Sequence, residues 1–416
     1  MTLLRHTGTE DARPASRWLS ILGIGEDGID GLSPVARLLL GQAGLVVGGA
    51  RHLALAEPLI RGQRMVWPIP MASGVSQILA RRPLPVAVLA SGDPFSDGVG
   101  VMLAEAVPVG EFVSIPAPSA YSLALSRLGW AARRTASISF CGRPLAPLAP
   151  LLQPARKIIG LSADAATPAA VAAFLRERGF GPSLLHVMEA LGGPRERIRT
   201  AAAQHFDLAG GDRLNLVAIE VVPGPDARVI PLSTGLPDEM FEHDGQITKR
   251  EIRAVTLAAL SPRAGEVLWD VGCGSGSVAI EWMLRHPENL AYGVESDPER
   301  AARIARNAAS LGVPGLHLVP GRAPEALAGL PSPDAVFLGG GAHLSGAIEA
   351  SWHALRPGGR MVANAVVIET EAALFAARER FGGTLTRLSV ERLDNIGALH
   401  GFRPGMTVTQ WSAVKP

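Results

Sequence analysis

Short runs of consecutive apolar residues alternate with helix-like segments in the first half of the chain. The clearest runs lie at residues 18–25, 85–91, 112–115 and 214–222. Strands that are apolar at every position are typical of sheets covered by helices on both faces. This half is therefore predicted to be an α/β domain, with 214–222 as its last strand.

A second and more regular series begins with a predicted helix at residues 249–260. Helical patterns separate the strands expected at 266–271, 290–295, 316–320, 335–339 and 360–365. This βαβ order predicts a parallel, doubly wound sheet with right-handed connections. After a last helix, 369–381, two strands are expected at 384–393 and 407–413. With no helix between them, they should pair antiparallel at one edge of the sheet.

The two series are separated by residues 223–244, which are rich in Pro and Gly and have no period. Such a composition is typical of an interdomain linker. The predicted domains are 18–229 and 245–416, joined by a linker at 230–244. Residues 1–17 are polar, lack the apolar core of a signal peptide and are predicted to form a loose N-terminal tail.

Composition narrows the class of function. Hydrophobic residues make up 47% of the chain and charged residues 19%, as in globular proteins. The net charge is +1 and no Lys/Arg run occurs, which argues against a nucleic-acid partner. No apolar stretch reaches the length of about 18 residues that predicts a membrane span. Cys141 and Cys273 show neither disulfide nor metal-ligand spacing. We therefore expect that the protein has no metal site and is located in the reducing cytoplasm.

The strongest chemical signal is the segment Asp270–Gly276, DVGCGSG, where an apolar strand runs into three glycines and then a helix. Glycines allow a sharp turn and a close approach of ligand to backbone. The free N–H groups at the start of the helix favour an anionic or polar group. The fingerprint G-x-G-x-x-G of dinucleotide sites would place its third glycine where Ser277 stands. Glu295, which ends the next strand, is placed to accept hydrogen bonds from ribose hydroxyls.

The spacing D-x-G-x-G-x-G resembles motif I of the class I, Rossmann-like S-adenosylmethionine methyltransferases. Residues 321–323 follow the third strand, where that family holds the adenine. The fourth strand ends in glycines 339–341, not in the Asn/Asp-Pro-Pro-aromatic tetrad of enzymes that methylate adenine or glutamine nitrogens, which argues against DNA or peptide-amide substrates. The resemblance implies cofactor contacts from Thr248, Gly272, Cys273, Gly274, Ser275, Gly276, Glu295 and Ala323.

Three loops stand out in the first half: residues 23–28 (GIGEDG), 92–98 (GDPFSDG) and 115–121 (IPAPSAY). The first two directly follow apolar strands, where open α/β sheets bind ligands. With residues 139–143 (SFCGR), they resemble the tetrapyrrole methylases, which are the class III methyltransferases. The resemblance implies a second cofactor site that includes Gly25, Gly92, Asp93, Ser119 and Ala120. The chain departs from the family pattern at Ala117, Ala120 and Cys141, where Gly, Ser and His are usual.

A class III half followed by a class I half resembles the precorrin-6Y C5,15-methyltransferase (decarboxylating) family of cobalamin biosynthesis, over roughly residues 18–414. By that resemblance the N-terminal half methylates C5 of a precorrin. The C-terminal half methylates C15 and removes the carboxylate of the C12 acetate, giving precorrin-8x. The resemblance also implies two S-adenosylmethionine sites per chain, a tetrapyrrole substrate, a cytoplasmic location and a homo-oligomer.

The carboxylates of such a substrate need cations near the expected cleft. The residues expected to supply them are Lys249, Arg250, Arg253, His400 and Arg403, although each could instead be a solvated surface charge. Glu242 and His243 are candidate proton movers for the ring. No catalytic residue is assigned, because the sulfonium of the cofactor already activates its methyl group.

Three other functions stay open. A methyltransferase acting on RNA or protein would need a basic face or a substrate-specific tetrad. A nicotinamide oxidoreductase would need a different glycine spacing. A non-catalytic tetrapyrrole-binding protein would bind without turnover.

Overall fold

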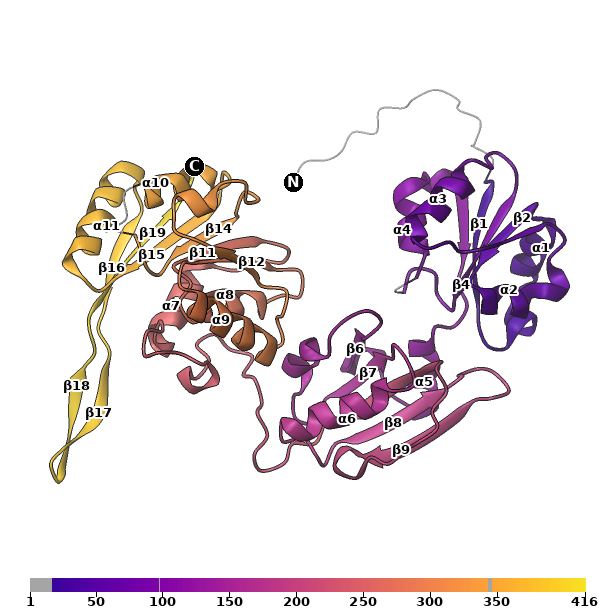
Figure 1. The fold of residues 1–416 in the computed structure, drawn as a ribbon, viewed down its shortest axis with the longest axis horizontal. Coiled ribbons are helices and arrows are strands. Elements are labelled where there is room, and N and C mark those ends of the chain that lie inside the picture. The colour runs from indigo at the N-terminus through magenta and orange to yellow at the C-terminus, as the bar shows by residue number, and fades with distance from the viewer. Residues whose placement is uncertain (1–16, 97, 343–345) are drawn as a thin grey trace. The chain divides into compact units, whose positions relative to one another are not determined.

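The computed structural model describes residues 17–96, 98–342 and 346–416, which form two compact units (Figure 1). The first unit runs to Arg143 and resumes from Pro154 to Ala227. The second comprises Pro144–Gln153 and Arg228–Pro416. The predicted N-terminal tail before Arg17 lies outside the described residues. Within the described part of the chain, no helix is both long enough and apolar enough to cross a membrane.

The segment predicted as a linker, 230–244, packs as part of the second unit. Its apolar side chains Ile230, Leu236 and Phe241 are only 3%, 0% and 4% exposed. The side chain of Gln153 donates a hydrogen bond to the Ile230 carbonyl at 2.9 Å. Because these apolar side chains are buried, the boundary between the units lies at Ala227–Arg228 and not in a free linker.

The first unit begins with a parallel sheet in the strand order β3-β2-β4-β1-β5. Leu22 packs with Leu40 and Leu53 on one face, and Ile21 packs with Ile78 on the other. This burial on both faces explains the unbroken apolar runs of the sequence. The strands are β1 (Leu19–Ile24), β2 (Leu45–Gly48), β3 (Gln63–Val66), β4 (Val86–Ser91) and β5 (Phe112–Ile115), and the helices are α1 (Pro34–Gln42), α2 (Ala50–Ala56), α3 (Met71–Leu79) and α4 (Gly100–Ala106).

The second sheet of this unit is mixed, in the order β6-β7-β10-β8-β9. Strand β10, which matches the strand predicted at 214–222, is antiparallel to both of its neighbours. Ala124 of α5 packs against Ile159 and Met188 of the sheet. The elements are β6 (Thr135–Ser139), β7 (Lys157–Leu161), β8 (Leu184–Glu189), β9 (Arg197–Ala202), β10 (Asn215–Glu220), α5 (Ala120–Leu128) and α6 (Thr167–Glu177).

The second unit is built on a seven-stranded sheet in the order β13-β12-β11-β14-β15-β19-β16. The first five are parallel, and β19 is antiparallel to β15 and β16. The predicted doubly wound sheet with an antiparallel edge is therefore confirmed. The strands are β11 (Val267–Val271), β12 (Leu290–Glu295), β13 (His317–Pro320), β14 (Ala335–Leu338), β15 (Arg360–Ala365), β16 (Thr384–Leu388) and β19 (Val408–Val414).

Helices cover both faces of this sheet. Leu257, Trp282 and Ile304 bring α7, α8 and α9 onto one face. Trp352 and Leu374 bring α10 and α11 onto the other. The helices are α7 (Arg250–Leu260), α8 (Ser277–Met283), α9 (Pro298–Ser310), α10 (Ala347–Ala354) and α11 (Ile368–Phe381).

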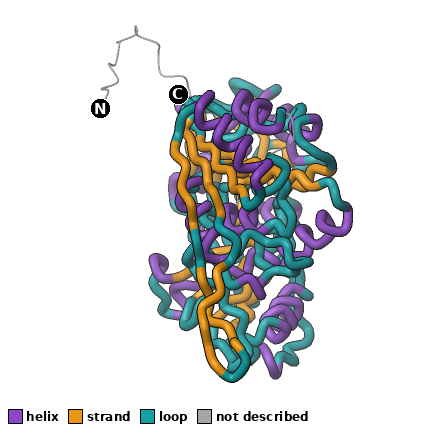
Figure 2. Tube along the Cα trace, turned by 90° about the vertical axis from the view of Figure 1, so that its left-hand side faces the viewer, coloured by secondary structure: helices purple, strands orange, loops and turns teal. Residues whose placement is uncertain are grey.

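A two-stranded hairpin, β17 (Glu391–Ile396) and β18 (Leu399–Pro404), extends beyond the seven-stranded sheet in both views (Figure 1, Figure 2). The sequence analysis predicted one strand at 384–393 here, and this was wrong because β16 ends at Leu388. Gly397 turns the hairpin with a φ of +64°. Its apolar side chains, such as Leu393 and Phe402, are exposed, so no burial pattern marked it in the sequence.

Candidate functional site

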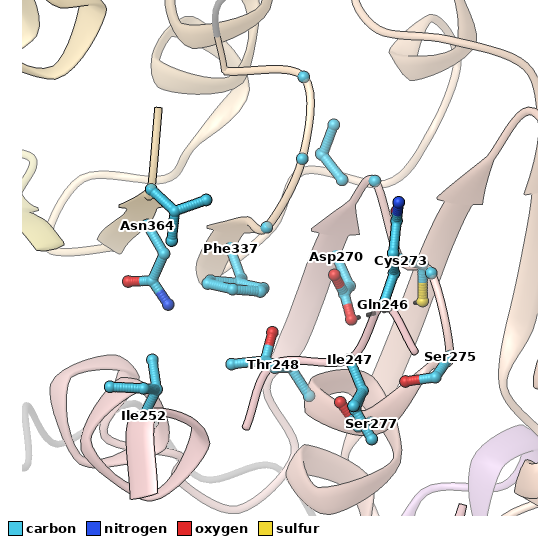
Figure 3. Close-up of a pocket in the computed structure, with 18 of the residues that line it drawn as sticks. Gln246, Ile247, Thr248, Ile252, Asp270, Cys273, Ser275, Ser277, Phe337 and Asn364 are labelled. Carbon is cyan, nitrogen blue, oxygen red and sulfur yellow. Dashed lines mark hydrogen bonds between the residues drawn. The ribbon is translucent and has the colours of Figure 1, made fainter. Parts of the chain in front are cut away.

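A pocket of about 820 Å³ lies at the carboxyl ends of the parallel strands of the second unit (Figure 3). Its wall includes the ends of β11, β12, β14 and β15 and the loops that follow them. The sheet order reverses at β11, which has β12 on one side and β14 on the other. Such a switch point is where open α/β sheets bind ligands. The segment 245–252 and residues at the base of the hairpin close the wall.

The three glycines of the turn after β11 all have a positive φ: +72° at Gly272, +60° at Gly274 and +78° at Gly276. A Cβ on Gly272 would lie 2.6 Å from the Gly340 carbonyl oxygen, and one on Gly276 would lie 2.7 Å from Cγ2 of Ile304. A Cβ on Gly274 would meet no heavy atom closer than 3.9 Å. The outer two glycines therefore permit close packing, and the middle one leaves its space to a ligand.

The carboxylate of Glu295 is fixed by three backbone N–H groups. Gly274 donates to its Oε2 at 2.9 Å, and Ser296 and Asp297 donate to its Oε1 at 2.9 and 3.0 Å. Glu295 lines the pocket together with the glycine turn. A carboxylate oxygen has further lone pairs, so Glu295 keeps acceptor capacity for a ligand hydroxyl.

Asp270 is the most strongly perturbed acid of this pocket. Its Oδ2 accepts hydrogen bonds from the Ala279 N–H at 3.1 Å and from the Cys273 thiol at 3.4 Å, while its buried Oδ1 has no partner among the described residues. Burial, with a smaller contribution from the negative charge of Glu295, raises the pKa of Asp270 to about 7. Burial and the nearby Asp270 raise the pKa of the Cys273 thiol well above its usual range, so Cys273 is a neutral donor.

The structure brings the other cofactor residues predicted from motif I into this one pocket. Thr248, Ser275 and Ala323 all line it, with Gly272, Cys273, Gly274 and Glu295. Gly276 does not line it and acts through packing of the turn on α9. Seven of the eight residues expected from motif I therefore line one pocket, and their contact with a cofactor stays a prediction.

The predicted substrate cations are mostly not at the pocket. Lys249 lines it, whereas Arg250, His400 and Arg403 do not. Arg403 lies on the hairpin, 3.1 Å from Asp394. The expectation for Arg253 is corrected, because its side chain is 0% exposed and does not line the pocket.

The Arg253 guanidinium donates hydrogen bonds to partners inside the second unit. Its Nε donates to Glu281 Oε1 at 2.6 Å and its Nη1 to Asp238 at 3.1 Å. It also donates to the carbonyls of Thr248 and Leu236. Arg253 is therefore a structural residue that fixes the segment before α7.

The pocket contains three arginines that the sequence analysis did not assign to substrate: Arg300, Arg322 and Arg392. Arg300 bonds Asp244 at 2.9 Å, and the Gln246 N–H, with the arginines of α9 adding to it, lowers the pKa of Asp244 to about 2. Arg392 pairs with Glu251 of α7. Among the described residues, neither Arg322 nor Lys249 has an acidic partner within 4 Å, so both are available to an anionic ligand.

The candidate proton movers do not line the pocket either. Glu242 pairs with Arg306 on α9, 2.8 Å away, and this arginine lowers the pKa of Glu242. His243 accepts a hydrogen bond from the Gly245 N–H through its Nδ1. Both are therefore part of the segment that leads to the pocket wall.

In the first unit the loops that begin at Gly23, Gly92 and Ile115 meet at the carboxyl ends of β1, β4 and β5. The Gly92 N–H donates to the Ile24 carbonyl at 3.1 Å, and the Ala117 N–H donates to the Gly92 carbonyl at 3.1 Å. A Cβ on Gly23 would lie 1.9 Å from the Gly92 oxygen, and one on Gly92 would lie 2.8 Å from Cα of Ser119. Only glycine fits where these backbones touch.

The remaining predicted residues of the first unit border this junction. Ser119 caps α5 by accepting the Ser122 N–H at 3.1 Å, and Ala120 is the first residue of that helix. Asp93 accepts the Phe95 N–H at 2.9 Å. Gly25 follows β1, where a Cβ would lie 2.6 Å from the Asp27 carboxylate.

A polar cluster beside this junction was missed by the sequence analysis. Arg51 bonds Glu26, the ring nitrogen Nε2 of His52 at 2.9 Å and the Ser91 hydroxyl at 3.1 Å. Arg195 approaches Glu26 to 3.5 Å. Burial, with Arg51 adding to it, lowers the pKa of His52 to about 4, so this histidine is neutral at physiological pH.

Comparison with known families places a different family model on each half of the chain. Residues 19–207 match the model of the tetrapyrrole (corrin/porphyrin) methylases, and residues 239–415 match the precorrin methyltransferase domain. A precorrin-6Y C(5,15)-methyltransferase (decarboxylating) from Sinorhizobium sp is 52% identical over 400 residues, which are 96% of this chain and 97% of the relative. The chain belongs to the precorrin-6Y C5,15-methyltransferase (decarboxylating) family. The resemblance stated from the sequence motifs is thereby confirmed.

Other members of the precorrin-6Y C5,15-methyltransferase family match the whole chain or its C-terminal half. One from Mycobacterium tuberculosis (strain CDC 1551 / Oshkosh) is 41% identical over 95% of this chain and 99% of its own. The crystal structure of the C-terminal domain of the Rhodobacter capsulatus member is 42% identical and covers 45% of this chain and 100% of that one, with a TM-score of 0.43.

Proposed function

We propose that this protein methylates a precorrin at C5 in its first unit and at C15 in its second, and that the second unit also removes the carboxylate of the C12 acetate, giving precorrin-8x. Each unit would use its own S-adenosylmethionine. The observation that carries the proposal is the pocket of the second unit, whose lining includes the glycine turn, Glu295 and Asp270 together with Lys249 and Arg322, two cations without an acidic partner among the described residues.

The residues present fit the cofactor. The open space over Gly274, the acceptor capacity of Glu295 and the unpartnered Oδ1 of Asp270 suit an adenosyl group that carries positive charge. The glycine turn, Glu295, Ala323 and Thr248 would hold it. Once bound, the cofactor supplies a methyl group already activated by its sulfonium.

The chain's own work is then binding and alignment. Lys249 and Arg322, together with Arg392, are the cations proposed for the substrate carboxylates in place of Arg250, Arg253, His400 and Arg403. The glycines at 339–341 line the pocket and allow a broad macrocycle to approach the backbone. Holding the acceptor carbon and the methyl group at near-attack distance can remove about 7–11 kcal/mol of the barrier in such a reaction.

For the first unit we propose a second cofactor site at Gly25, Gly92, Asp93, Ser119 and Ala120. Its support is the contact of three loops at the carboxyl ends of adjacent parallel strands. Because Cys141 and Cys273 are both free thiols, a cytoplasmic location remains part of the proposal, as does a homo-oligomer.

The test separates the two activities in the full chain. Wild-type protein given precorrin-6B and S-adenosylmethionine should add two methyl groups and release CO₂, counted by mass spectrometry. At a cofactor concentration near the wild-type Kd of the second site, Glu295→Ala should add mainly one methyl group, at C5, and keep the carboxylate. Glu299→Ala, an exposed acid of α9 that does not line the pocket, is the matched control and should behave as wild type. Two methyl groups added by Glu295→Ala would contradict the assignment of the second unit.

A further inference from the structure

Asn364 is a pocket residue that neither the sequence motifs nor the cofactor assignment explains. It lies near the end of β15 and lines the pocket on the side of Phe337 opposite Asp270 (Figure 3). The strand register pairs Asp270 with Phe337 and Phe337 with Val362. Since Asn364 is two residues beyond Val362, Asp270, Phe337 and Asn364 all project from the same face of the sheet.

The Asn364 carboxamide is held by two buried side chains behind it. Its Nδ2 donates to the Thr256 hydroxyl at 2.9 Å, and its Oδ1 accepts from Gln410 Nε2 at 2.9 Å. Gln410 also donates to Thr256 at 3.1 Å. Gln410 is the direct cross-strand partner of Asn364 on β19, and Thr256 lies on α7 above the sheet.

This arrangement orients one donor toward the pocket. A carboxamide has two N–H donors, of which Thr256 accepts one. Gln410 donates to the oxygen, so a flip of the Asn364 amide would set two N–H groups against each other and lose that hydrogen bond. A polar network satisfied in this way fixes the geometry of its members. The second N–H of Asn364 is left for a ligand.

The ligand it would serve is the acceptor and not the cofactor. Of the proposed cofactor residues, the glycine turn, Glu295 and Ala323 lie on the β11–β12–β13 side of the pocket, whereas Asn364 is two strands away from β11 in the other direction. Lys249 and Arg392, which we assign to substrate carboxylates, line the same pocket. An amide N–H is a good partner for one carboxylate oxygen.

We propose that Asn364 binds the acceptor by donating its free N–H to a carboxylate side chain of the tetrapyrrole. Thr256 and Gln410 are positioning residues that act through Asn364. This inference rests on the proposed function of the second unit, and it adds the residue that sets the orientation of the macrocycle in front of the methyl group.

The test uses the full-length protein and three measurements: S-adenosylmethionine affinity by calorimetry, kcat and KM for C15 methylation by mass spectrometry, and thermal stability. Asn364→Ala should lower kcat/KM about 10- to 100-fold, as expected for loss of a hydrogen bond to a charged group, and leave cofactor affinity unchanged. Asn395→Ala, an exposed asparagine of the hairpin outside the pocket wall, is the control.

Two further variants keep the test decisive if Asn364→Ala is unstable. Asn364→Asp preserves shape but replaces the donor by a negative charge, so it should raise KM more than Asn364→Ala does. Gln410→Met should lower kcat/KM to a lesser degree, and the double variant Asn364→Ala/Gln410→Met should be no worse than Asn364→Ala, because Gln410 acts only through Asn364.

Several results would overturn the inference. Wild-type kcat/KM in Asn364→Ala, or losses that multiply in the double variant, would show that the network is only structural. A tenfold loss of cofactor affinity in Asn364→Ala would move Asn364 to the cofactor half of the pocket. If wild-type protein performs no C15 methylation, the proposed function itself fails, which is a different outcome from a normal Asn364→Ala enzyme.

Discussion

The buried ion pair between Arg253 and Glu281 should be essential for the stability of the second unit. Both side chains are 0% exposed, and their closest N–O distance is 2.6 Å. Glu281 also accepts the backbone N–H groups of Gly235 and Leu236 at 2.7 and 2.8 Å. The pair therefore joins α7, α8 and the segment that leads into the unit.

Arg253→Met would remove the positive charge and leave the Glu281 carboxylate buried with only two N–H donors. It would also leave the carbonyls of Thr248 and Leu236 without the guanidinium. Breaking a buried pair on one side costs about 3–5 kcal/mol. For a unit of roughly 200 residues this corresponds to a fall in melting temperature of roughly 6–20 °C.

Differential scanning calorimetry of the full chain measures this shift, and hydrogen exchange of α7 and α8 peptides assigns it to the second unit. Arg250→Met is the matched control, because Arg250 is exposed and makes one hydrogen bond, of 2.9 Å, to the Gly235 carbonyl. Its cost should stay near 1 kcal/mol. If Arg253→Met costs no more than Arg250→Met, the buried network does not stabilise the unit. A stable Arg253→Met enzyme with a raised KM would restore Arg253 as a substrate ligand.

Three other predictions concern the pocket itself. The folded state raises the pKa of Asp270 from 3.8 to about 7, so the stability that the protonated carboxyl contributes is complete below pH 4. This contribution is lost as pH rises through 7, by about 4 kcal/mol at most. Asp270→Asn should flatten this part of a profile of melting temperature against pH, and an unchanged slope would refute the assignment. Glu295→Ala should weaken S-adenosylmethionine binding at the second site roughly 10- to 100-fold in calorimetry, with the other site unaffected. Arg392→Ala should raise the KM for the precorrin. Glu251→Ala frees Arg392 from its ion pair, so it should lower this KM at low salt. Equal KM values in both variants would remove Arg392 from the substrate site.

The sequence predicted the sheets because burial leaves a direct trace in residue type. Strand β11 is buried at every position and reads as an apolar run in which only Asp270 is charged. The antiparallel edge was also predictable, since no helix separates β16 from β19. The hairpin was not, because Leu393 and Phe402 are apolar yet exposed, and a pattern of burial is the only signal that apolar residues give.

The residues of the proposed cofactor half of the pocket could be named from the sequence, and those of the proposed acceptor half could not. The glycine turn has φ values near +60 to +80° at 272, 274 and 276, which favours glycine, and the close packing at 272 and 276 leaves no room for a Cβ. Such a constraint acts within a few consecutive residues and appears as a motif. Position 253 shows the opposite case. Arg253 was expected to contact the substrate because it lies near the expected cleft, but its guanidinium pairs with the internal carboxylate of Glu281.

The acceptor half is assembled from single side chains that the chain brings together over long separations. Asn364 meets Thr256 across 108 residues and Gln410 across 46, and Arg392 meets Glu251 across 141. These contacts leave no motif in the sequence, because each helix or strand contributes only one polar side chain to them. A change of acceptor would therefore need few substitutions and no change in the turn that holds the cofactor. It follows that altered substrate preference in this pocket should be sought at positions 249, 364 and 392, where a side chain can be exchanged without disturbing the backbone of the glycine turn.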